Sequence, residues 1–125
     1  FRKVCNHNRN LTREQAVEIS KKGGYIGLNL YYKFVCENID IDSESYSIDT
    51  IIPHIKYAHD IGIDDYIGFG LDTDGVGDIY PRDINLKSSI HDEIINMLSA
   101  CGYGHEFLKK LCGNNFLNFI LQYGL

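Results

Sequence analysis

The segment YIGFGLDTDG, residues 66–75, decides the fold. Its first six residues form a short apolar run without alternation, which is typical of a strand buried on both faces of a parallel sheet. Asp72 and Asp74 follow directly, and Gly75 permits a sharp turn. Because α/β folds place ligands and catalytic groups at the carboxyl ends of parallel strands, this segment predicts both a strand and a candidate site.

The flanking sequence repeats this pattern. The run YIGLNLYY, residues 25–32, predicts a second strand of the same kind. Capping residues and apolar periodicity predict four helical stretches, of which the first begins with a Thr12–Gln15 capping box. The stretches run from Thr12 to Gly23, from Asp49 or Thr50 to Gly62, from Ser88 or Ser89 to Gly102, and from His105 to Tyr123 with an interruption at residues 113–115. Long connections are expected at residues 33–47 and from Asp72 to about Lys87. This order implies βα units around a parallel sheet.

The chain has 125 residues and a mass of 14.3 kDa, which allows one domain. With 44% hydrophobic and 23% charged residues it is expected to fold. Two parallel strands are too few to stand alone, because both faces and both edges need cover. We therefore predict that residues 1–125 form the C-terminal segment of one larger α/β domain, without an internal boundary.

Charge excludes some classes of partner. Twelve basic against seventeen acidic residues give a net charge of −5, which disfavours nucleic acid and anionic membrane surfaces. No apolar run is long enough for a membrane helix, and no export or anchor signal is visible, so a cytoplasmic location is the default expectation. The first residue is Phe1 rather than Met, which predicts a processed chain or part of a longer one. The cysteines form no C-x-x-C pair and are expected to be reduced thiols: Cys5, Cys36, Cys101 and Cys112.

Asp72 and Asp74 are open to several interpretations. They can cap a tight turn, or belong to a calcium loop, although Gly75 comes too early for the usual calcium pattern. They also resemble the nucleophile and the acid/base of haloacid-dehalogenase phosphatases. That family needs further motifs after later strands, and only two helical stretches follow here.

A second resemblance covers essentially the whole chain. The chain resembles the membrane (renal) dipeptidase family of metallopeptidases, in five motifs that agree in order and spacing. These are CNHNRNLT at 5–12, GGYIGLN at 23–29, IIPHIKY at 51–57, GFGLDTDG at 68–75, and the tail with GY at 102–103 and LCGNNFL at 111–117. Departures from the family pattern are Leu71, Thr73 and Asn118.

This resemblance implies a (β/α)₈ TIM-type barrel with a two-zinc site that cleaves dipeptides, including those with a D residue in second place. The chain would supply the last helix of unit six, units seven and eight, and the C-terminal helix. The family's zinc ligands fall upstream of Phe1, so no metal ligand is expected in this segment. Arg9 matches the arginine that holds the substrate's carboxylate. Asp72 matches the aspartate beside the metal-bound water, and is expected to pass a proton to the departing amine.

Three residues are predicted to support these two, namely Asp74 in the turn, His7 near Arg9, and Tyr31 at the end of a strand. The expected function is thus zinc-dependent dipeptide hydrolysis by the parent protein, with the isolated 125-residue chain inactive because the metal site is absent. The expected partners are a dipeptide and the missing N-terminal part of the barrel. Alternatives are a non-catalytic fragment whose open strand edge drives homo-oligomerisation, an inactive dipeptidase-like protein, and the phosphatase.

Overall fold

A computed structural model describes residues 1–36, 47–72 and 90–124. Asp74 and most of both long connections lie outside these residues. In the part that is described, no helix is long and apolar enough to cross a membrane.

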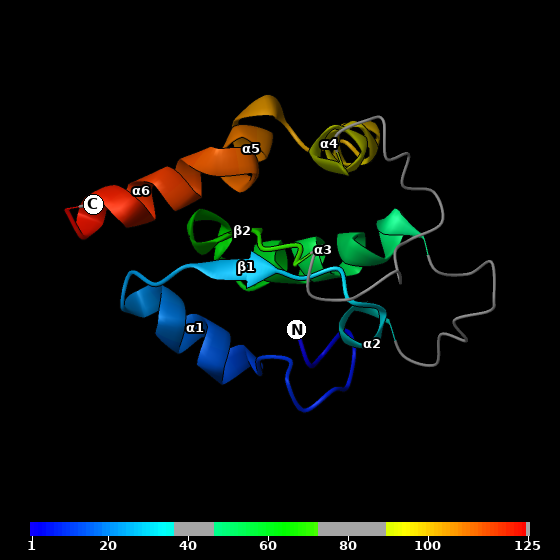
Figure 1. Cartoon of the computed structure of the whole chain (residues 1–125), viewed down its shortest axis with the longest axis horizontal. Coiled ribbons are helices and arrows are strands. Elements are labelled where there is room, and N and C mark those ends of the chain that lie inside the picture. Colours follow the sequence, from blue (N-terminus) through cyan, green and yellow to red (C-terminus); the bar gives the residue numbers. More distant parts are fainter. Residues whose placement is uncertain (37–46, 73–89, 125) are drawn as a thin grey trace.

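Two short parallel strands form the centre of the chain (Figure 1). Strand β1 is Ile26–Leu28 and strand β2 is Ile67–Phe69, with Gly27 paired to Gly68. Backbone bonds continue beyond the strands, from Gly70 N–H to the Leu28 carbonyl at 3.0 Å and from Leu30 N–H to the Leu71 carbonyl at 3.5 Å. The predicted parallel pairing is therefore confirmed, and both strands direct their carboxyl ends to the same edge.

Glycines let these strands approach closely. A Cβ placed on Gly27 would lie 3.1 Å from the Gly70 Cα, and a Cβ on Gly70 would lie 3.1 Å from the Gly27 Cα. Contacts this short are tighter than side chains normally accept, so the pair fixes a narrow, side-chain-free strip on one face of the sheet.

Helices flank the strands. Helix α1 begins with the predicted capping box, in which Thr12 Oγ1 accepts from Gln15 N–H at 3.2 Å and Gln15 Oε1 accepts from Thr12 N–H at 2.9 Å. Helix α3 follows a 3₁₀ turn and carries Pro53 in its first turn, where the missing N–H costs nothing. The C-terminal arm is kinked at Gly113 by a π-helical turn. The bounds are α1 Arg13–Lys21, η1 Ile48–Ile51, α3 Ile52–Asp60, α4 Ile90–Ala100, α5 His105–Lys109, η3 Lys110–Asn114 and α6 Asn115–Gln122.

One continuous core joins these elements. Ile67 of β2 is fully buried and packs in one cluster with α3, α4 and η3. The other large side chains that are essentially inaccessible are Cys5, Ile51, Ile55, Ile63, Ile94, Leu98 and Leu111. Ile67 and Gly68, which face opposite sides of β2, are both buried, as expected for a strand covered on both faces, whereas β1 leaves Gly27 exposed.

The strands are shorter than the sequence predicts, and two short elements were missed. Helix α2, Tyr32–Val35, occupies the end of the predicted first strand, and a 3₁₀ turn η2, Asp64–Tyr66, precedes β2. The first strand ends early because Asn29 Oδ1 accepts the Tyr31 N–H at 2.6 Å. A side chain that bonds its own backbone two residues on turns the chain away from the ladder.

Candidate active site

A cavity of about 190 Å³ lies beside β1 and the N-terminal loop. Its wall combines the edge of β1 with the loop at residues 9–11, the ring of Phe34 from α2, and two residues of the η1–α3 segment. The lining residues are Phe1, Arg9, Asn10, Leu11, Ile26, Gly27, Leu28, Asn29, Phe34, Ile51 and His54. The predicted substrate-binding residue Arg9 is thus part of this wall.

The loop that carries Arg9 is fastened to α2. Asn10 Nδ2 donates to the Cys5 carbonyl at 2.9 Å and to the Phe34 carbonyl at 2.8 Å, and Cys5 Sγ lies 3.3 Å from the Lys33 carbonyl. Because α2 follows the carboxyl end of β1, these bonds hold Arg9 at that end of the sheet. The C-terminal edge is where parallel α/β folds place their ligands.

The guanidinium of Arg9 forms no ion pair with a carboxylate of the described residues. The side chain is exposed, with Cζ 5.5 Å from the centre of the Phe34 ring. An aromatic face orients a guanidinium without neutralising it, so the planar fork can still donate two parallel hydrogen bonds to a carboxylate.

His7 and Tyr31, both predicted as supporting residues, lie beside the same ring. His7 Nδ1 accepts the Arg9 N–H at 3.2 Å, and the rings of His7 and Tyr31 each lie 4.9 Å from the ring of Phe34. Phe34 was not singled out from the sequence, because it stands in the connection predicted at residues 33–47, where Val35 and Tyr46 give no weaker a signal.

Asp72 stands at the carboxyl end of β2 with an unusual backbone. Its φ is +55°, the only described non-glycine residue with a positive φ. Aspartate tolerates this left-handed conformation better than most residues, and such conformations concentrate at functional sites. The carboxylate is exposed, and its Oδ2 accepts a hydrogen bond from Asn29 Nδ2 at 3.4 Å.

Asn29 connects the two predicted functional residues. Asn29 lines the same cavity as Arg9 and also donates to Asp72, which is not itself a lining residue. Arg9 and Asp72 therefore lie at one end of the parallel sheet, on the loop before α1 and after β2 respectively. Asp74, the remaining predicted residue, lies outside the described residues.

His54 forms the buried back of the cavity. It is 3% exposed, its Nδ1 lies 2.5 Å from the Phe1 nitrogen, and its Nε2 lies 3.1 Å from the Val35 carbonyl. Burial, and secondarily the charge of the Phe1 amine, lowers the pKa of His54 to about 4. The imidazole is therefore neutral near pH 7 and acts as a bridge between the N-terminal loop, α2 and α3.

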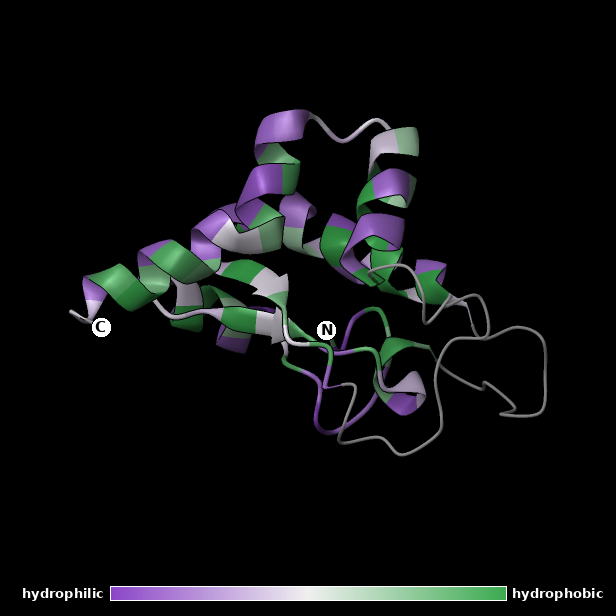
Figure 2. Cartoon of the chain, turned by 45° about the horizontal axis from the view of Figure 1, so that its top comes forward, coloured by the Kyte–Doolittle hydropathy of each residue, from purple (hydrophilic) through white to green (hydrophobic). Residues whose placement is uncertain are grey.

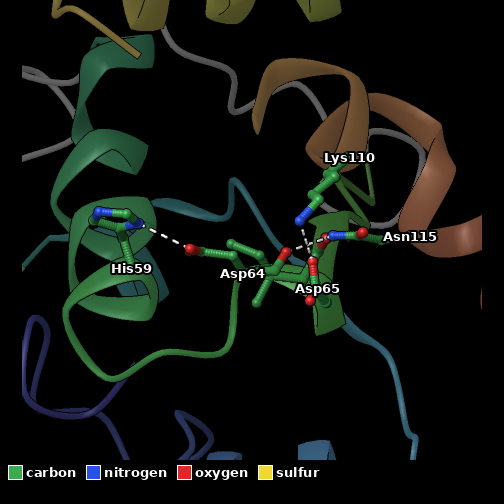
Figure 3. A network of polar contacts seen from close by, with 6 residues as sticks. His59, Asp64, Asp65, Lys110 and Asn115 are labelled. Carbon is green, nitrogen blue, oxygen red and sulfur yellow. Dashed lines mark hydrogen bonds and ion pairs between the residues drawn. The ribbon is translucent and has the colours of Figure 1, made fainter. Parts of the chain in front are cut away.

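The opposite end of β2 carries a separate polar network (Figure 3). Asn115 Nδ2 donates to the Asp64 carbonyl at 2.6 Å and to the Ile67 carbonyl at 2.8 Å. Lys110 Nζ lies 2.6 Å from Asp65 Oδ1, and His59 Nδ1 lies 2.9 Å from Asp64 Oδ2. These contacts join α3, η2 and the C-terminal arm at the amino end of the strand, away from the cavity.

Metal-binding side chains do not converge in the residues described here. Within residues 1–36, 47–72 and 90–124, no group of three or more His, Cys, Asp or Glu side chains could hold a metal ion. The described residues thus do not themselves fit a zinc centre.

A comparison with known protein families shows to which family the chain belongs. A family model described as membrane dipeptidase, peptidase family M19, matches residues 1–123. The chain belongs to this family. The resemblance noted from the five sequence motifs is confirmed.

Individual relatives agree with this membership. The chain is 32% identical over 117 residues to an uncharacterized protein of Klebsiella pneumoniae from the region 5′ of pqqA, and 27% identical over 115 residues to an uncharacterized dipeptidase of Schizosaccharomyces pombe. It covers 42% and 27% of the lengths of these proteins. The chain therefore spans less than half of the curated relatives it matches.

Two solved metallopeptidases share the fold. One is the M19 dipeptidase AC, with a TM-score of 0.81, and the other is a Rhodobacter sphaeroides metallopeptidase liganded with a phosphinate mimic of the dipeptide L-Ala-D-Ala, with a TM-score of 0.79. Each is 26% identical, and the match covers 94% of this chain but 34% and 32% of theirs. The mixed helix–strand fold is thus that of M19 dipeptidases over about one third of their length.

Proposed function

We propose that the complete protein of which this chain forms part is a metal-dependent dipeptidase, and that this chain supplies the end of its barrel. The units would be the last helix of unit six (α1), unit seven (β1 with α3), unit eight (β2 with α4), and the C-terminal arm. The observation that carries the proposal is the family match over residues 1–123, together with Arg9 and Asp72 at one end of the sheet. Membership in a peptidase family favours this function over the phosphatase.

Arg9 would hold the C-terminal carboxylate of a dipeptide. Its guanidinium is exposed, is unpaired with any described carboxylate, and is oriented by Phe34 and by the Asn10 bonds. A charge-assisted pair with a free carboxylate distinguishes dipeptides from longer peptides, whose next residue would replace that carboxylate with an amide. The dipeptide mimic bound to the Rhodobacter relative supports a substrate of this class, with a D residue accepted in second place.

Asp72 would transfer the proton that peptide hydrolysis requires. Its exposed carboxylate can accept a proton from the attacking water and donate it to the departing amine. Peptide hydrolysis needs such a transfer because an amine leaves poorly unless it is protonated. Asp74 would orient the turn that follows.

The two zinc ions expected from the family resemblance would be held by the rest of the barrel. Because the resemblance puts the family's zinc ligands upstream of Phe1, Arg9 and Asp72 would complete a site whose metal is held by the rest of the protein. We therefore expect the isolated chain with added zinc to hydrolyse no dipeptide. A cytoplasmic location stays a prediction.

The assay that tests this function is hydrolysis of L-Ala-D-Ala by the complete protein with zinc. Asp72→Asn should lower kcat by at least about 100-fold with a small change in KM, because a general acid/base contributes about that much. The matched control is Asp65→Asn at the other end of β2, which should keep wild-type activity. An Asp72→Asn variant with wild-type kcat would overturn the proposal.

A second candidate, self-association without catalysis, is favoured by the surface of α6. Four large apolar side chains on α6 and directly after it are about half exposed, namely Phe116, Leu117, Leu121 and Tyr123 at 48%, 53%, 61% and 57%. Figure 2 shows hydrophobic colouring along this C-terminal helix. Patches of this kind usually mark contact surfaces. Light scattering decides: a monomeric 125-residue chain at micromolar concentration would exclude this candidate, and a dimer dissociated by Leu117→Gln with Leu121→Gln would support it.

A further inference from the structure

We infer that Asn29, which lines the same cavity as Arg9, is a positioning residue that holds the Asp72 carboxylate beside its own amide. The inference rests on the proposed function for its catalytic meaning. Its structural basis is the pair of hydrogen bonds made by one side chain, from Tyr31 N–H to Asn29 Oδ1 at 2.6 Å and from Asn29 Nδ2 to Asp72 Oδ2 at 3.4 Å.

The first of these bonds fixes which way the amide faces. A backbone N–H can only donate, so it selects the amide oxygen and leaves the NH₂ group on the other side. That NH₂ group can only donate and therefore suits an ionised carboxylate. Asn29 is half-buried at the end of β1, and its orientation is set by the turn into α2 rather than by Asp72.

The register of the sheet brings the two side chains together. Leu28 pairs with Phe69, and continuing that register by one residue sets Asn29 beside Gly70. Gly70 has no side chain, and neither has Gly27, which lies next to it on the neighbouring strand. No side chain therefore stands between the two strands on this strip of the sheet. Asp72 then turns back with a φ of +55°, so its carboxylate reaches the amide across an open strip.

This arrangement gives Asn29 a defined chemical effect. A donor that faces the ionised form of a carboxylate stabilises that form relative to the protonated one. Asn29 thus holds the Asp72 carboxylate in one orientation. A purely structural asparagine would stabilise the turn at residues 29–31 but would leave the titration of Asp72 unchanged.

The test measures the titration of the Asp72 carboxyl by NMR in the 125-residue chain. Asn29→Asp keeps an acceptor for the Tyr31 N–H but places a second carboxylate against Asp72. The upper apparent pKa of the pair should rise by at least about one unit. Asn118→Asp on the exposed face of α6 makes the same change of charge at a distance and should shift Asp72 by less than about 0.2 units.

Kinetics of the complete protein provide the second readout. Asn29→Ala should lower kcat about tenfold and leave KM nearly unchanged, because the loss affects the orientation of Asp72 and not substrate binding. Unchanged titration of Asp72 in Asn29→Asp would overturn the inference. If instead the complete protein hydrolyses no dipeptide while the titration shifts as expected, the proposed function fails and the Asn29–Asp72 coupling stands.

Discussion

Different side chains lie at the two ends of the sheet. At the carboxyl end, Arg9 and Asp72 are exposed charged groups held in place by Asn10 and Asn29. At the amino end, Asn115 is 3% exposed and donates hydrogen bonds to the carbonyls of Asp64 and Ile67. In (β/α)₈ barrels, the fold that we propose for the complete protein, the carboxyl end carries the chemistry and the amino end contributes to stability.

Asn115 should therefore be a stability residue. Asn115→Leu leaves the carbonyls of Asp64 and Ile67 without their donor and should lower the free energy of unfolding by about 1–3 kcal/mol. Urea denaturation measures this change. Asn114→Leu, at the exposed neighbouring position, is the control and should stay within about 0.5 kcal/mol of wild type. Equal losses at both positions would contradict the assignment.

Among the elements, α1 is the one whose start the sequence defines best. Its N-terminus was predicted from Thr12 and Gln15, and the structure shows both capping bonds. A local signal of this kind depends on residues three apart and needs no tertiary context.

Thr12→Ala should thus lower the free energy of unfolding by about 1 kcal/mol, because it removes the acceptor for the Gln15 N–H. Thr12→Ser keeps a hydroxyl in the same place and should retain most of that stability. Thermal or urea unfolding of the two variants provides the comparison. A serine variant that loses as much as the alanine variant would show that the cap bond is not the cause.

The elements that the sequence missed depend on longer contacts. Helix α2 was predicted as strand end and loop because Tyr31 and Tyr32 are typical strand residues. Its position is set by Asn10, which is distant in sequence, and by the Asn29 turn. The strand direction and pairing were predicted, whereas the bounds were not, because only three residues in each strand keep strict register.

For the molecule as a whole, the family followed from five short motifs, whereas the residues that form the wall of the cavity did not. Arg9, His7 and Tyr31 were singled out individually, but their meeting at Phe34 required the fold. The incomplete sheet also followed from counting strands. The exposed apolar side chains of α6 could not be predicted, because their exposure depends on which face of that helix the fold leaves uncovered.

The stability of the whole chain should depend on pH through His54. Its pKa is about 4 in the folded chain and about 6.5 when exposed, so between these values the unfolded chain binds more protons. The stability that His54 contributes is fully present above pH 6.5 and declines as the pH falls toward 4, by about 3 kcal/mol in total.

Urea denaturation at pH 7 and pH 4.5 measures this loss. His54→Gln removes the titrating group, so its stability should change less over the same range. His105→Gln, at an exposed site, should follow the wild type. Identical pH dependence for wild type and His54→Gln would contradict the assignment.

The central claim is that Arg9 and Asp72 act on one dipeptide, with Arg9 gripping its free carboxylate. The most direct measurement compares kcat/KM for L-Ala-D-Ala and for its C-terminal amide in the complete protein. Two charge-assisted hydrogen bonds worth about 3 kcal/mol predict a preference for the free acid of about 100-fold, reduced to less than about tenfold in Arg9→Gln. Arg13→Gln, on the exposed first turn of α1, should keep the wild-type preference. An Arg9→Gln protein that prefers the free acid as strongly as wild type would contradict the account.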